Sequence, residues 1–172
     1  MRAIAIRRLS PASRDDYRKI RLEALRASPE AFGSTYELES QRPIEAFAER
    51  LAGSIVFGAY LGDEIVGMVG IAGGQGPKER HKAFLWGMYV RADMTGKGVG
   101  RALVEAILEA APAGIEQITL AVVKENAAAQ ALYRRLGFTV YGAEPRALKI
   151  GDHYADEILM VKFLWATQAS EE

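Results

Sequence analysis

The sequence contains no cysteine and only two histidines among its 172 residues. The absence of cysteine excludes disulfides, thiolate-bound metals and a covalent acyl-cysteine intermediate. His81 and His153 are too few and too far apart in the chain for a convincing metal site without carboxylate partners. We therefore predict no metal.

The chain also lacks an excess of one charge and a long apolar run. Lysine plus arginine and aspartate plus glutamate number 22 each, so the net charge gives no reason to expect nucleic acid or an anionic membrane as a partner. No apolar run approaches the roughly 20 residues needed to span a bilayer, and the N-terminus does not read as a signal peptide. We expect a soluble cytoplasmic protein with a single domain at residues 1–165 and a frayed C-terminal tail at 166–172.

The most informative stretch is a glycine-rich turn between a predicted strand and a predicted helix. An apolar run at 83–90 ends in a short polar turn, and three glycines follow at alternate positions between 96 and 100. The first N–H groups of the next helix lack helical partners, and the helix dipole adds partial positive charge, so an anion can bind there. Glycine lets a phosphate approach the backbone, and Lys97 and Arg101 add formal charge.

Two better-known phosphate motifs do not fit this turn. The nucleotide P-loop requires Ser or Thr after its lysine, whereas Lys97 is followed by Gly98. The dinucleotide fingerprint needs Gly or Ala three residues after its second glycine, and that position is Arg101. The pattern favours a phosphate loop of another kind, with a tight connection that binds nothing as the alternative.

Two segments resemble the GCN5-related N-acetyltransferase (GNAT) family. They are residues 85–103, in which LWGMYV precedes GKGVGRAL, and residues 126–138, which read NAAAQALYRRLGF. Gly98 and Gly100 match the two small residues of the family's phosphate loop, while Thr95 stands where Gln or Arg is usual. The resemblance extends from the first strand to about Leu164 and implies the α/β (in some schemes α+β) acyltransferase fold, with a mixed sheet of about seven strands and about four helices.

Periodicity and turn signals give the expected elements. The expected helices cover 11–27, 43–52, 101–111 and 127–136, and the expected strands cover 3–9, 55–61, 65–72, 83–90, 117–123, 138–141, 147–150 and 157–164. Turns are expected at Glu144-Pro145 and Gly151-Asp152. A strand-helix-strand crossover makes strands 83–90 and 117–123 parallel, and the resemblance implies that they part at their C-terminal ends around the pantetheine arm of coenzyme A.

The resemblance implies acetyl-CoA as the cofactor and assigns the residues that hold it. Backbone groups of residues 88–90 would pair with pantetheine, a backbone N–H near Met88 would stabilise the oxyanion, and the loop 95–101 would bind the diphosphate. The implied cofactor residues are Met88, Tyr89, Val90, Thr95, Gly96, Lys97, Gly98, Val99, Gly100, Arg101, Asn126 and Tyr133.

Asn126 and Tyr133 are seven residues apart, so they share one face of a helix. The resemblance gives Asn126 a hydrogen bond to the pantetheine or phosphate region and makes Tyr133 the general acid toward the coenzyme A sulfur. Asn126 also suits a plain helix N-cap, and core packing beside Leu132 and Leu136 is the alternative for Tyr133.

The acceptor side is less defined. The resemblance implies a primary amine as acceptor, and the predicted binding residues are Phe32, Tyr36, Trp86 and Tyr154, with core packing as their alternative. Strand 83–90 lacks the glutamate that many family members use as a base. The candidates that remain are Glu37, Glu39, His81, Asp152, His153 or an ordered water.

The function that these observations favour is acetyl transfer by direct attack of a small-molecule amine in a ternary complex. A non-catalytic acyl-CoA sensor and an acetyltransferase acting on protein N-termini or lysines are the alternatives. The resemblance also allows a homodimer paired through the terminal strands.

Overall fold

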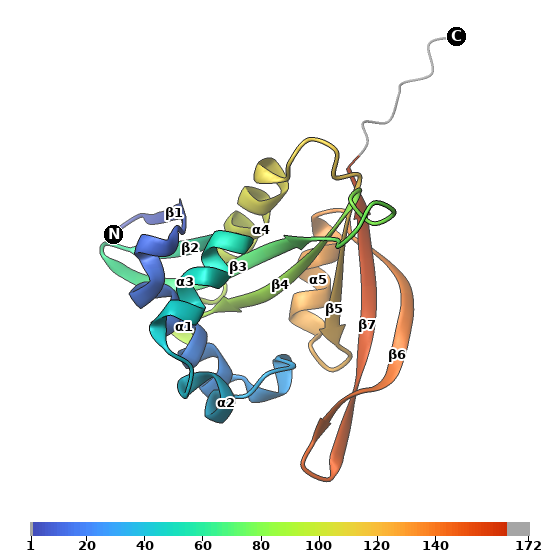
Figure 1. Ribbon diagram of the computed structural model, residues 1–172. Coiled ribbons are helices and arrows are strands. Elements are labelled where there is room, and N and C mark those ends of the chain that lie inside the picture. Colours follow the sequence, from blue (N-terminus) through green and yellow to red (C-terminus); the bar gives the residue numbers. More distant parts are fainter. Residues whose placement is uncertain (1, 165–172) are drawn as a thin grey trace.

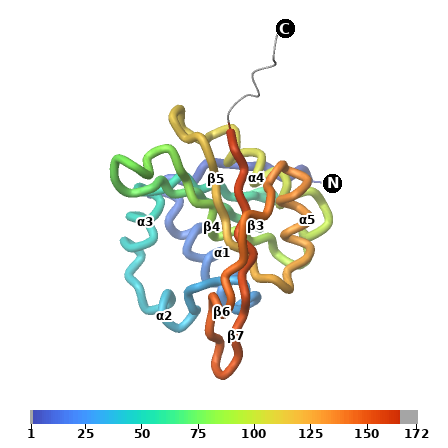
Figure 2. The backbone as a smooth tube through the Cα atoms, turned by 90° about the vertical axis from the view of Figure 1, so that its right-hand side faces the viewer, coloured from blue at the N-terminus to red at the C-terminus, as the bar shows by residue number. Residues whose placement is uncertain are grey.

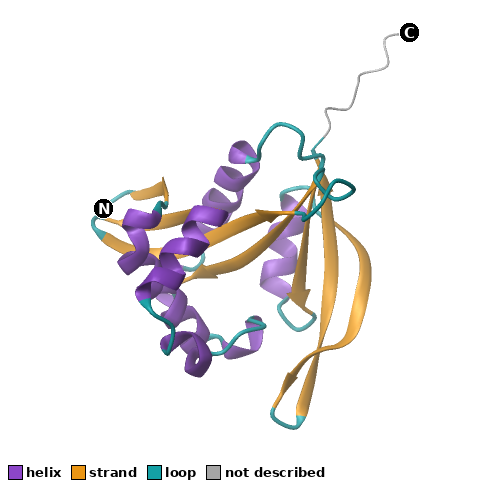
Figure 3. Ribbon diagram, in the orientation of Figure 1, coloured by secondary structure: helices purple, strands orange, loops and turns teal. Residues whose placement is uncertain are grey.

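The computed structural model describes residues 2–164, which form one seven-stranded mixed sheet with helices on both faces (Figures 1 and 3). The expected α/β fold class is confirmed. The expected tail at 166–172 lies outside the described residues. The strands are β1 (Ile4–Arg8), β2 (Ile55–Leu61), β3 (Glu64–Gly73), β4 (Lys82–Val90), β5 (Gln117–Val123), β6 (Thr139–Ile150) and β7 (His153–Phe163).

The strand order is β1-β2-β3-β4-β5-β7-β6. Every neighbouring pair is antiparallel except β4 and β5, which are parallel as the crossover predicts. Strand β4 therefore lies at the centre of the sheet, and its residues Ala83, Leu85 and Tyr89 are buried. The expected burial on both faces is incomplete, because Phe84 is 47% exposed.

Five α-helices of the described chain cover the two faces of the sheet. They are α1 (Arg14–Ala27), α2 (Tyr36–Ser40), α3 (Ile44–Gly53), α4 (Val99–Ala110) and α5 (Ala127–Arg135). Helices α2 and α3 lie on one side of the strands and α4 and α5 on the other (Figure 2). None of the helices in residues 2–164 has the length and apolar character of a membrane span.

The core consists of two clusters of buried side chains, one on each face. Even-numbered residues of β5 (Ile118, Leu120) and Met160 of β7 pack against α4 and α5, while α1 and α3 pack Tyr17 and Phe47 over β2 and β3. Because side chains alternate along a strand, the odd-numbered residues of β5 and β7 face the α1 side. Helices α1 and α3 cover the β1-to-β4 half of that face and leave the β5-β7-β6 half open (Figure 1).

The region after α1 contains more helix than the sequence suggests. A short 3-10 turn, η2 (Pro29–Ala31), is followed by the five-residue helix α2, for which we made no prediction. The Thr35 hydroxyl accepts a hydrogen bond from the amide of Leu38 at 3.2 Å and caps α2. One helical turn is too short to produce an apolar periodicity that a sequence pattern would reveal.

The expected chain reversal at Glu144-Pro145 is wrong, because β6 runs through these residues as one strand. Its pairing with β7 shifts register between Glu144 and Leu148, and Arg146 adopts a positive φ of 52°. The Arg146 amide donates to the Asp156 carboxylate at 2.8 Å, which fixes this bulge. A bulge on an edge strand accommodates proline. The expected turn at Gly151-Asp152 is confirmed, and the β6-β7 hairpin projects from the sheet (Figure 1).

A buried ion-pair cluster holds α1, α2 and α3 together. The Arg21 guanidinium donates two hydrogen bonds of 2.9 Å to the Glu39 carboxylate, which is 1% exposed. Arg50 of α3 also donates to Glu39, at 3.4 Å, and to the Tyr17 hydroxyl, at 3.2 Å. Burial alone raises the pKa of Glu39, but hydrogen bonds and charge from Arg21 and then Arg50 outweigh burial and lower the pKa to about 2.

We predict that Glu39→Ala lowers the free energy of unfolding by about 3 to 5 kcal/mol, because the buried guanidinium of Arg21 and the partly buried guanidinium of Arg50 lose their carboxylate partner. The stabilisation by Glu39 is complete above the unfolded-state pKa of about 4.3. It is lost as the pH falls toward the folded value of about 2. Urea denaturation of both proteins at pH 7 and pH 3 measures the difference. The exposed neighbour variant Glu49→Ala should change stability by less than about 0.5 kcal/mol, and an equal effect of the two substitutions would contradict the cluster's role.

Candidate active site

The central strands β4 and β5 are paired along only part of their length. Their parallel pairing covers Lys82 to Phe84 on β4 and Gln117 to Thr119 on β5, after which no pairs form. Gly87 has a φ of +66°, which turns the β4 backbone away from a regular strand just beyond this point. The two strands therefore part at their C-terminal ends, as the GNAT resemblance implies.

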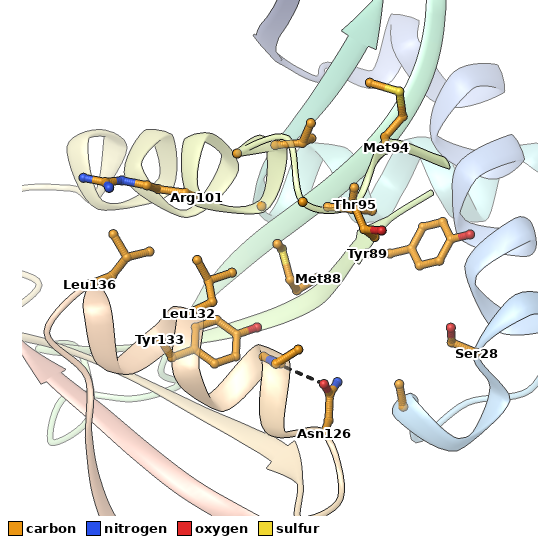
Figure 4. Close-up of a pocket in the computed structure, with 18 of the residues that line it drawn as sticks. Ser28, Met88, Tyr89, Met94, Thr95, Arg101, Asn126, Leu132, Tyr133 and Leu136 are labelled. Atoms are coloured by element: carbon orange, nitrogen blue, oxygen red, sulfur yellow. Dashed lines mark hydrogen bonds between the residues drawn. The ribbon is translucent and has the colours of Figure 1, made fainter. Parts of the chain in front are cut away.

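A cavity of about 510 Å³ occupies the gap between the end of β4, the start of α4 and the helix α5 (Figure 4). Most of the predicted cofactor residues line this cavity, which we call the cofactor groove. They are Met88, Tyr89, Val90, Thr95, Gly96, Gly98, Val99, Gly100, Arg101, Asn126 and Tyr133. Phe32, predicted for the acceptor side, lines it too, whereas Lys97 does not. The structure thus brings together two sequence segments about 30 residues apart.

Backbone geometry makes the start of α4 suitable for phosphate. Gly98 is the N-cap residue in the left-handed conformation, with a φ of +79°, and no atom lies within 4 Å of the position that a Cβ would take. The first backbone bond of the helix runs from Ala102 N to Gly98 O. The N–H groups of residues 99–101 precede it and have no helical partner. An anion can therefore reach several backbone donors at the positive end of the helix dipole.

The charged and polar side chains near the loop are partly engaged elsewhere. The Thr95 hydroxyl donates to the Ala92 carbonyl at 2.9 Å, so it secures the turn. Arg101 donates to Glu105 at 2.7 Å, and its side chain is largely exposed. The backbone amides, more than these side chains, are therefore available to an anion at this turn.

Asn126 and Tyr133 border the groove from α5. The Asn126 side-chain oxygen accepts a hydrogen bond from Ala129 N at 3.1 Å, which confirms its capping role. Tyr133 is 4% exposed, and its ring packs edge-on against Phe138. Within residues 2–164 its hydroxyl has no hydrogen-bond partner, and it points toward Met88 in the groove (Figure 4). Burial raises the pKa of Tyr133, so the phenol remains protonated and can donate.

A second cavity, of about 530 Å³, lies between the α1-α2 region and the β6-β7 hairpin, and we call it the side cavity. Phe32 lines both cavities. The walls of the side cavity combine apolar and polar side chains, and the Ser34 hydroxyl is buried there without a hydrogen-bond partner in the described chain. The lining residues are Leu25, Arg26, Pro29, Phe32, Gly33, Ser34, Thr35, Tyr36, Glu37, Ala147, Leu148, Lys149, Ile150 and Gly151.

Two of the four predicted acceptor residues line the side cavity and two do not. Phe32 and Tyr36 border it. Trp86 lies outside the lining of both cavities and packs edge-on against Tyr17 at 6.5 Å. Tyr154 lies beside Arg146 and Lys149, half exposed, and lines neither cavity. Tyr89 donates to Glu23 of α1 at 3.2 Å, which ties β4 to α1. Of these aromatic residues on β4 and β7, Tyr89 lines the cofactor groove, and Trp86 and Tyr154 line neither cavity.

The structure separates the base candidates. Glu39 is unsuitable, because its pKa of about 2 and its two arginine partners remove its basicity. His81 precedes β4 at the end of the sheet opposite the groove. Asp152 and His153 lie at the hairpin tip and do not line either cavity, whereas Glu37 lines the side cavity.

Sequence comparison agrees with this geometry. A profile of the "Acetyltransferase (GNAT) family" matches residues 17–138, which include the α1 region, the glycine loop and α5. The chain belongs to the GNAT acetyltransferase family. Among curated relatives of this GNAT protein is an L-methionine sulfoximine/L-methionine sulfone acetyltransferase of Pseudomonas aeruginosa, 43% identical over 60 residues. That match covers 34% of this chain and 35% of the relative, so the chain spans about a third of the length of the curated relatives it matches.

Solved structures share the fold of this GNAT protein across nearly the whole chain. An acetyltransferase of the GNAT family from Streptococcus pneumoniae has a TM-score of 0.82 at 24% identity, covering 94% of this chain and 99% of the other. The yncA protein of Salmonella typhimurium, a putative acetyltransferase solved with its cofactor acetyl-CoA, has a TM-score of 0.81 at 21% identity, with 98% of each chain covered.

Acetyl-CoA is the cofactor that this family uses, and the groove fits it on three observations. The unpaired edges of β4 and β5 can pair with the amide groups of pantetheine. The first turn of α4 presents free N–H groups to a diphosphate. A protonated phenol, Tyr133, points into the groove (Figure 4).

We predict that Gly98→Ala weakens coenzyme A binding about tenfold, because loss of one hydrogen bond to a charged phosphate costs about 1.5 kcal/mol. The methyl group favours a negative φ and so moves the backbone N–H groups at the start of α4. Isothermal calorimetry measures the affinity. Gly114→Ala is the control, since Gly114 also has a positive φ, of 96°, and no neighbour within 4 Å of its Cβ position. Unchanged affinity in Gly98→Ala would refute the backbone phosphate site.

Proposed function

We propose that the protein transfers the acetyl group of acetyl-CoA to the primary amine of a small molecule. The observation that carries this proposal is the pair of cavities that share Phe32: the cofactor groove ends beside a separate side cavity. The side cavity, at about 530 Å³, is within the range of sites that enclose small ligands. A groove for a protein substrate would be an open surface channel.

Three parts of the groove have proposed roles in the reaction. The backbone of residues 88–90 positions pantetheine, and the amides at the start of α4 hold the diphosphate. An N–H near Met88 donates to the oxygen that becomes negative when the amine attacks the thioester carbonyl. Tyr133 donates to the departing sulfur. With no cysteine in the chain, the amine attacks directly in a ternary complex.

An amino acid is the acceptor to test first. The curated relatives acetylate L-methionine sulfoximine and sulfone, according to their names. In this chain Leu25, Leu148 and Ile150 give the side cavity apolar walls that suit an aliphatic side chain, and Arg26 and Lys149 bring positive charge for a carboxylate.

The test is release of free thiol from acetyl-CoA in the presence of single amines: amino acids including methionine sulfoximine and sulfone, polyamines, aminoglycosides and short peptides. We expect release with at least one small amine above the rate without acceptor. Release only with peptides would indicate a protein acetyltransferase. Coenzyme A binding without release for any amine would indicate a sensor and would contradict the proposal.

In the same assay Tyr133→Phe should lower kcat about 100-fold, a typical effect of removing a general acid. The KM for acetyl-CoA should change little, because the ring remains packed against Phe138. Tyr141→Phe is the control, since Tyr141 is 57% exposed and lines neither cavity. Equal turnover in Tyr133→Phe and the wild type would show that another group protonates the thiolate.

A further inference from the structure

Strand β7 carries an acidic side chain, Glu157, on the open face of the sheet. Glu157 is paired with Val123, the last residue of β5, on one side and with Glu144 of β6 on the other. Because β7 alternates regularly, Glu157 shares its face with Ala155, two residues away and opposite Leu148. That face is the one toward α1, which forms the wall of the side cavity at Leu148 and Ile150.

Glu157 lines neither cavity itself, but residues close to it along the paired strands line each of them. Its partner Val123 is three residues before Asn126, which lines the cofactor groove. Ala155, two residues before Glu157, pairs with Leu148, which lines the side cavity. The turn η2 contacts β5 from the same face. Pro29, at its start, lines the side cavity, and Ala31, at its end, lines the groove.

Glu157 is not committed to any structural interaction. It is half buried, and no hydrogen bond or ion pair joins its carboxylate to another residue of the described chain. Its charged neighbour across the β6-β7 pair is another carboxylate, Glu144. Burial, and next the charge of Glu144, raise the pKa of Glu157. Because the Glu157 carboxylate has no cationic partner among the described residues, it can attract an ammonium group, and because its pKa is raised, it can accept a proton from that group.

We propose that Glu157 is the general base of this protein, a catalytic residue that removes a proton from the acceptor ammonium directly or across one bound water. The inference rests on the proposed function, since it assigns a role in that reaction. Strand β4 lacks the glutamate that many family members use as a base, and Glu157 supplies a carboxylate from β7, two strands further along the sheet.

The proton balance of the reaction is complete with this assignment. The acceptor ammonium gives one proton to the Glu157 carboxylate, and the freed lone pair forms the bond to the acetyl carbonyl carbon. The carbon–sulfur bond breaks, and Tyr133 supplies a proton to the thiolate. The new amide nitrogen loses a second proton, which restores Tyr133 through water, and Glu157 releases its proton to solvent.

The experiment compares Glu157→Gln with the wild type on two acceptors at neutral pH. One is the fastest panel amine that is protonated at this pH, and the other is hydroxylamine, which is already unprotonated. We expect kcat/KM to fall about 100-fold for the protonated amine, as for loss of a general base, and less than threefold for hydroxylamine. Equal falls for both acceptors, or no fall for either, would overturn the assignment.

Two further variants make the result specific. Glu37→Gln tests the rival carboxylate in the side cavity, and a selective loss in this variant in place of Glu157→Gln would assign the base to Glu37. Glu109→Gln, exposed on α4, is the remote control. The thermal midpoint of Glu157→Gln should not fall, because no ion pair is lost. A wild type inactive on every amine would refute the proposed function itself, and the role of Glu157 with it.

Discussion

The partial pairing of β4 and β5 is the constraint on which the rest of the site depends. Two parallel strands that were hydrogen-bonded along their full length would leave no free backbone edge and no gap between them. Here pairing stops at Phe84 and Thr119, and the positive φ of Gly87 takes the β4 chain away from its neighbour. The groove, the backbone donors of residues 88–90 and the approach to Tyr133 all follow from this separation.

The gap needs support from both faces of the sheet. On one face α4 and α5 pack through Leu103, Ile107 and Tyr133, which places the start of α4 opposite the side chain of Tyr133. On the other face the Arg21–Glu39 pair fixes the α1-α2 region, whose Phe32 ring lies 5.3 Å from the Arg21 guanidinium. Phe32 lines both cavities, so this buried ion pair positions the boundary between the cofactor groove and the side cavity. The Arg21–Glu39 ion pair thus contributes both to the stability of the fold and to the shape of the two cavities.

The cofactor side could be predicted from sequence because it depends on local features. Glycines at alternate positions before a helix predict free backbone N–H groups at its start, and a spacing of seven residues places Asn126 and Tyr133 on one helix face. Neither prediction depends on contacts with distant parts of the chain. The acceptor side depends on contacts between distant segments. In the sequence Glu157 is an ordinary residue of a predicted strand. Only the strand pairing of the folded protein shows that it lies between Val123 and Glu144. Likewise, Pro145 suggests a chain reversal, and only the pairing with β7 shows a bulge in a continuous β6.

We propose that backbone amides at the start of α4 hold the diphosphate of coenzyme A. Calorimetric titration of the protein with coenzyme A and with pantetheine, which lacks the diphosphate and the nucleotide, tests it most directly. Two or more hydrogen bonds to a charged phosphate, each of about 1.5 to 3 kcal/mol, predict at least about 100-fold tighter binding of coenzyme A. Equal affinities for the two ligands would contradict the account.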